Sequence, residues 1–162
     1  MDRAGLLMRL EKAWEELKNS YGGLSEQEML EPGVAGTWSV KDVIAHVTCW
    51  EEEALTHLPL ILKGGRPPRY SVLYGGIDAF NARMSLRSQA FCLSQVIERR
   101  DFVHSRLLDF IRGVPEEQIV KETRFRRRLR LDTYGHYLEH ARALRNWRKS
   151  KGLIPGNSGL EA

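Results

Sequence analysis

The sequence contains little cysteine and no long apolar run, and each absence excludes a class of protein. Two cysteines among 162 residues, Cys49 and Cys92, are too few for the disulfide framework of a small secreted domain. No apolar stretch approaches the roughly 18 residues of a membrane-spanning helix. The N-terminus also lacks the apolar centre of a signal peptide. We therefore expect a cytoplasmic protein with no membrane partner.

The chain also lacks a strong excess of charge of either sign. Its 25 basic and 21 acidic residues give a formal net charge of +4, which is weak evidence for an anionic partner. A hydrophobic content of 42% is ordinary for a globular protein. At 162 residues the chain is long enough for one domain with a real core.

Apolar residues recur every three or four positions, which is the period of a helix with one buried face. No strand pattern is present, and there is no internal repeat. This periodicity predicts four main helices, at residues 3–21, 40–62, 94–112 and 133–150. Four helices sharing one core make an all-α four-helix bundle. We expect this domain to span residues 1–151, followed by a flexible tail over residues 152–162.

Two segments between these helices are harder to interpret. The apolar pattern changes phase between residues 85 and 94, which predicts an additional short helix from 77 to about 90 before the third main helix. A single kinked helix fits nearly as well. Residues 116–131 have the composition of a polar connector, with five arginines among the seven residues 124–130. We expect Phe125 and Leu129 to attach this connector to the bundle while the arginines face water or nearby acids.

The arginine run has two other interpretations, a contact with an anionic substrate or a second copy, and binding of nucleic acid. Phosphate binding needs clustered basic side chains, which the run supplies. No base-reading motif accompanies it, however, and the total charge is small. Nucleic acid is therefore not the partner we expect.

Two histidines four residues apart, His136 and His140, lie in the fourth predicted helix, where this spacing places both imidazoles on one face. His46, on the flank of the apolar stripe of the second main helix, is the candidate for a third metal ligand. The glutamate of the zincin motif is absent, because Tyr137 follows the first histidine of the pair. A buried histidine bonded to a neighbouring side chain explains His46 equally well.

The segment 38–46, WSVKDVIAH, followed by Trp50 and Glu51, resembles the second-helix motif of the DinB/YfiT-like superfamily of four-helix-bundle metalloenzymes. The resemblance covers nearly the whole chain in helix order and spacing. It implies three ligands to a divalent zinc, nickel or iron ion, His46, His136 and His140. It also implies a homodimer, but not one reaction. The superfamily includes thiol-dependent isomerases and transferases, and a colibactin self-resistance hydrolase branch that often lacks the full triad, which this chain keeps.

Three protein ligands leave a position open for water or substrate, as in catalytic rather than structural zinc sites. Bound water would then be acidified to a pKa of about 7, or a low-molecular-weight thiol would bind as thiolate. Glu53, about 10 Å along the helix from His46, is a candidate general base, although it also fits a solvated acidic run. Asn81 is a candidate polar group of the pocket, although an ordinary helix residue is an equal alternative.

These observations predict a metal-dependent hydrolase or thiol-dependent transferase that acts on a small molecule. Two alternatives from other classes stay open. One is a non-catalytic, stress-related binding or sequestering protein in which the histidine site is vestigial. The other is a nucleic-acid binder that uses the arginines.

Overall fold

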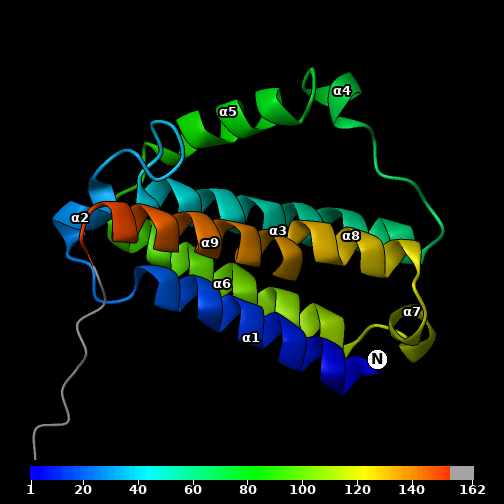
Figure 1. The fold of residues 1–162 in the computed structure, drawn as a ribbon. Helices are drawn as coiled ribbons and strands as arrows, with labels where there is room; N and C mark the ends of the chain where they lie inside the picture. The colour runs from blue at the N-terminus through cyan, green and yellow to red at the C-terminus, as the bar shows by residue number, and fades with distance from the viewer. Residues whose placement is uncertain (154–162) are drawn as a thin grey trace, which may run out of the picture.

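The computed structural model describes residues 1–153, and these residues form helices joined by loops, with one isolated β-bridge between Ala35 and Trp38. Figure 1 shows the long helices lying side by side along a common direction. Within residues 1–153, none of the helices combines the length and the apolarity that crossing a bilayer requires. The helices in chain order are α1 (Arg3–Tyr21), α2 (Glu26–Leu30), α3 (Val40–Leu62), α4 (Tyr70–Leu73), α5 (Ile77–Ser88), α6 (Leu93–Arg112), α7 (Glu116–Val120), α8 (Arg124–Asp132) and α9 (Tyr134–Ser150).

The bundle core lies between α1, α3, α6 and α9, which correspond to the four predicted main helices. α1 packs chiefly against α9, and α3 packs chiefly against α6 (Figure 1). The apolar stripe of each helix faces this core, so that burial of these side chains stabilises the four helices together. Fully buried members include Leu10, Ile44, Leu107 and Leu144. The predicted all-α four-helix bundle is confirmed.

The start of α3 is held by a reciprocal cap. The Asp42 amide donates to the Ser39 hydroxyl oxygen at 3.2 Å, and the Ser39 amide donates to the Asp42 carboxylate at 2.9 Å. This capping box satisfies two amide groups that have no partner within the helix. His46 lies just under two turns further along, so the cap determines where along the bundle its imidazole lies.

The phase change before the third main helix marks a break in the chain. α5 ends at Ser88 and α6 begins at Leu93, so the predicted separate short helix is confirmed and the single kinked helix is wrong. α5 packs against α3, on the far side of α3 from α1 (Figure 1). One further turn of helix, α4, lies between α3 and α5.

The prediction of a polar connector at 116–131 is wrong, because most of this segment is helical, as α7 and α8. The Thr123 hydroxyl oxygen accepts from the Arg126 amide at 3.2 Å and caps α8. Phe125 and Leu129, four residues apart, are both 0% exposed. The two apolar side chains therefore attach α8 to the bundle as expected, but they do so as one face of an amphipathic helix.

α8 runs into α9 with an interruption at Thr133, whose φ of −130° and ψ of −108° are not helical. Gly135 lies at this junction, and a Cβ atom there would lie 2.8 Å from the carbonyl oxygen of Arg130. Only glycine allows this close approach of the two helix ends. The junction sets the position of α9 and therefore of His136. The tail predicted from residue 152 onward falls mainly outside the described residues.

Candidate metal centre

The three histidines converge across the contact between α3 and α9. His46 comes from α3, and His136 and His140 come from successive turns of α9. The Nε2 atom of His136 lies 3.0 Å from Nε2 of His46 and 2.9 Å from Nε2 of His140. One ligand atom from each ring lies within 4.8 Å of the other two. The structure thus brings together the three residues that the sequence selected as candidate ligands.

All three imidazoles are held in the neutral form. Burial, reinforced by the neighbouring His140, lowers the pKa of His46 to about 3. Burial and the two other histidines lower the pKa of His136 to about 2. Burial also lowers the pKa of His140. Neutral imidazole is the form that binds metal, so no proton has to be displaced at neutral pH.

Hydrogen bonding alone does not satisfy this arrangement. A neutral imidazole Nε2 either carries a proton or offers one lone pair, so His136 Nε2 cannot bond fully to both neighbours. A divalent cation between the rings would accept all three lone pairs. Three nitrogen ligands at about 2.1 Å from one tetrahedral zinc ion lie about 3.4 Å apart, so the two Nε2 separations of 3.0 and 2.9 Å need to widen by only about 0.5 Å. The donor set and its spacing therefore fit a metal ion.

Aromatic rings surround the histidines on the side of α5. The Trp38 ring lies 4.7 Å from the His46 ring, and the Trp50 ring lies 6.0 Å from that of His136. The Trp50 indole N–H donates to the Asn81 side-chain oxygen on α5 at 3.1 Å. Asn81, a candidate site residue, thus holds in place one of the rings beside the histidines.

Glu53 is not one of the residues whose ligand atoms converge. Its carboxylate accepts from the Tyr70 hydroxyl at 2.5 Å and lies 3.0 Å from His57 Nε2. The Tyr70 ring in turn lies 5.5 Å from that of Trp50. The Glu53 carboxylate is therefore held in place by Tyr70 and His57.

Glu51 is a buried polar residue of this region that the sequence analysis did not select. Its side chain is 0% exposed, and it accepts from the Tyr137 hydroxyl and lies 2.8 Å from His104 Nδ1. Trp14 stacks on the His104 ring at 3.9 Å between centroids. Burial raises the pKa of Glu51, and the His104 hydrogen bond opposes that rise. A signal was present, because Glu51 falls on the buried stripe of α3 between Val47, Ala54 and Leu58.

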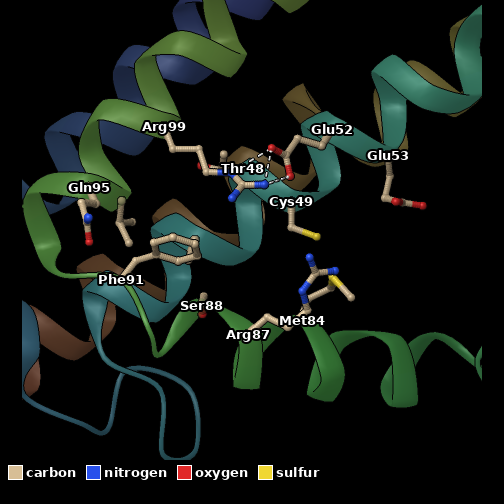
Figure 2. A pocket seen from close by; sticks show the side chains of 12 residues that line it. Thr48, Cys49, Glu52, Glu53, Met84, Arg87, Ser88, Phe91, Gln95 and Arg99 are labelled. Carbon is tan, nitrogen blue, oxygen red and sulfur yellow. Dashed lines mark hydrogen bonds and ion pairs between the residues drawn. The ribbon is translucent and has the colours of Figure 1, made fainter.

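A cavity of about 330 Å³ lies between α3, α5 and α6 (Figure 2), and its described lining residues include Glu53 but none of the three histidines. Ala45 and Cys49 line it, next to His46 in the sequence and one turn further along. Arg99 donates twice to the Glu52 carboxylate at 2.9 Å, as the dashed lines in Figure 2 show. Burial and two nearby glutamates raise the pKa of the Cys49 thiol to about 12. The cavity thus presents a protonated thiol, an ion pair and apolar walls.

Three solved structures share this fold at low sequence identity. The colibactin self-resistance protein ClbS, in complex with a dsDNA, is 16% identical, with a TM-score of 0.75 over 91% of this chain and 96% of that one. The sibling lethal factor precursor DfsB is 13% identical, with a TM-score of 0.77 over 93% and 97%. An uncharacterised protein from Escherichia coli UTI89 is 15% identical, with a TM-score of 0.74 over 93% and 95%. At these identities the likeness concerns the fold.

The comparison with curated proteins finds no match for this chain. A family model for the DinB superfamily matches residues 9–143, a span that includes all three histidines and every main helix in whole or in large part. The match agrees with the resemblance of the α3 motif and with the bundle architecture. The chain belongs to the DinB superfamily.

Proposed function

We propose that the protein is a metal-dependent enzyme, a hydrolase or a thiol-dependent transferase that acts on a small molecule. The observation that supports this most strongly is the convergence of three neutral imidazole nitrogens from α3 and α9. His46, His136 and His140 would hold a divalent zinc, nickel or iron ion. When bound, the ion would supply an acidified water molecule or a coordinated thiolate.

The other residues of the site would exclude water, accept a proton and orient the substrate. Trp38 and Trp50 flank the histidines and would exclude bulk water, which strengthens electrostatic interactions. Glu53 would accept a proton, because its carboxylate is positioned by Tyr70 and His57. Asn81 would orient polar substrate atoms with its amide while its oxygen accepts from Trp50.

The cavity in Figure 2 is where part of a substrate would lie. Its volume, about 330 Å³, is within the range of small-ligand sites. Phe91 and Met84 supply apolar walls, and Arg87 supplies a positive charge. Because Ala45 and Cys49 belong to the same turns of α3 as His46, a ligand in this cavity would lie close to the metal-bearing helix.

An activity screen on three forms of the protein tests the proposal. Metal-loaded protein, chelator-treated protein and His140→Ala would each be incubated with a panel of esters and amides, and with electrophiles plus a low-molecular-weight thiol. Mass spectrometry of the products should show turnover by the metal-loaded form alone. Met8→Ala, at a position of α1 that is 70% exposed and does not belong to the site, serves as the control. Equal turnover by His140→Ala would contradict the proposal, and metal binding without any turnover would favour the sequestering alternative.

We also propose that the protein forms a homodimer through the outer side of α4 and α5. Four apolar side chains of α4 and α5 are at least half exposed, Val72 at 78%, Leu73 at 50%, Ile77 at 54% and Leu86 at 69%. Exposed apolar side chains that gather on one side are typical of a protein interface. The family resemblance supports the same assembly.

Contact with duplex DNA is the second candidate function. The ClbS structure contains a dsDNA, and α8 of this chain carries five arginines. The ClbS complex weakens the sequence-based expectation that nucleic acid is not a partner. Measurement of the affinity for duplex DNA tests this second candidate function.

A further inference from the structure

The arginines of α8 form part of a second hollow, away from the histidines. It is lined by α8 and by the segment that runs from the end of α3 through α4 to the start of α5, and its volume is about 610 Å³. Its basic lining residues are Arg69, Arg124, Arg127 and Arg128. We call this hollow the arginine groove. No aspartate or glutamate is among its lining residues in the part of the chain that the structure describes.

Some arginines of α8 and the groove form ion pairs with carboxylates, and others do not. Outside the groove, Arg126 and Arg130 lie 3.7 and 3.6 Å from the carboxylate of Glu122. Inside it, Arg128 pairs with Asp132 at 2.5 Å and donates to the Tyr70 hydroxyl at 3.0 Å. The carboxylates near α8 therefore pair with the two arginines outside the groove and with one arginine inside it.

Among residues 1–153, the remaining three arginines of the groove have no carboxylate partner. Arg124 donates to the carbonyl oxygen of Gly65 at 3.2 Å, which does not cancel its charge. Within residues 1–153, Arg69 and Arg127 have no ion pair, and both side chains are exposed. Guanidinium groups gathered without counter-charge repel one another, and an anion placed between them relieves that repulsion.

The walls of the groove are apolar. Pro67 and Pro68 lie on one side, and Ile77 and Leu131 are also part of the lining. Leu131 is 68% exposed although it is a large apolar residue. Apolar walls around a few charged groups are the usual composition of an organic-ligand site. Guanidinium forks match phosphate oxygens in a two-point geometry.

We propose that the arginine groove binds a small organic phosphate, with its phosphate group on Arg69 and Arg127 and its apolar body against the prolines and Leu131. A duplex is the weaker fit, because α8 is nine residues long and would span only about 13 Å of a phosphate backbone. The groove is also separate from the metal centre. None of the three histidines is among its described lining residues, and the Trp50 ring lies 5.5 Å from the Tyr70 ring and 6.0 Å from the His136 ring.

Calorimetric titration with phenyl phosphate tests this proposal on the full chain. We expect binding that weakens on the order of tenfold in Arg127→Gln and in Arg69→Gln, because each substitution removes one charge-assisted contact. Arg130→Gln, on the same helix but outside the groove, is the matched control and should change the affinity by less than about twofold. Inorganic phosphate should bind more weakly than phenyl phosphate, since it lacks the apolar body.

Circular dichroism should show the same helix content for all three variants, because each alters an exposed side chain. No binding of phenyl phosphate up to about 10 mM would overturn the proposal, as would an equal loss of affinity in Arg130→Gln. A random duplex that binds more tightly and displaces phenyl phosphate would also overturn it and assign the groove to nucleic acid.

Discussion

The Tyr137 hydroxyl on α9 donates a hydrogen bond to the fully buried carboxylate of Glu51 on α3. Tyr137 directly follows His136, and Glu51 lies five residues after His46. The bond therefore joins the two helices that carry the candidate ligands, close to the point where the ligands meet. His104 holds the same carboxylate oxygen from α6 at 2.8 Å.

Tyr137→Phe removes this bond and keeps the ring. We expect it to lower the free energy of unfolding by about 1–3 kcal/mol, because a buried carboxylate loses one of its donors. Chemical denaturation measures the change. Tyr134→Phe is the matched control, since its ring is buried on the same helix but its hydroxyl does not contact Glu51. Equal stability of the two variants would show that the bond to Glu51 contributes nothing.

The two cysteines should differ in reactivity. Burial raises the pKa of Cys49 to about 12, so about one thiol in ten thousand is ionised at pH 8. Cys92 is exposed, and its hydrogen bond with Ser94 lowers its pKa, so its thiolate fraction is larger at the same pH. Mass spectrometry after brief treatment with iodoacetamide should find Cys92 alkylated first. Labelling that is as fast in Cys92→Ser as in the wild type would contradict the burial of Cys49.

The proposed homodimer predicts a mass of about twice 18.6 kDa by light scattering. Leu86→Glu places a charge among the exposed apolar side chains of α5 and should shift the mass toward that of the monomer. Met8→Glu, at an apolar position of α1 that is 70% exposed, should leave the mass unchanged. A monomeric wild type at tens of micromolar protein would exclude the dimer.

Duplex DNA should bind weakly. Arg126 and Arg128, in the middle of the run, are paired with Glu122 and Asp132, which cancels part of the charge available to phosphates. We expect no submicromolar affinity for a random duplex at about 150 mM salt, where non-specific phosphate contacts are weakened. Fluorescence anisotropy measures this. Tight binding that disappears when Arg126, Arg127 and Arg128 are all changed to alanine would make DNA contact the better function.

Local patterns in the sequence predicted the main helices, because an apolar stripe depends on residues within one or two turns. The same reasoning missed α8. Its five arginines indicated a solvated connector, although Phe125 and Leu129 already had the spacing of a buried helix face. That interpretation rested on the arginine content of the segment, whereas the four-residue spacing of its two apolar residues indicated the helix correctly.

The candidate ligands were selected from their spacing and from the resemblance of the α3 motif. Their surroundings depend on contacts between distant segments, which a local pattern does not contain. Tyr70 reaches Glu53 because the segment after α3 folds back over the bundle (Figure 1). Glu51 is one of three consecutive glutamates, and the partners that bury it come from α6 and α9, far away in the sequence.

The metal content of the purified protein tests the central proposal most directly. Elemental analysis of the wild type should find about one divalent ion per chain, because three neutral imidazoles converge at one point. His140→Ala should lose stoichiometric metal while circular dichroism stays unchanged, since the apolar stripes carry most of the helix stability. His57→Ala should keep its metal. Full occupancy in His140→Ala, or a wild type that takes up no metal at neutral pH, would contradict the account.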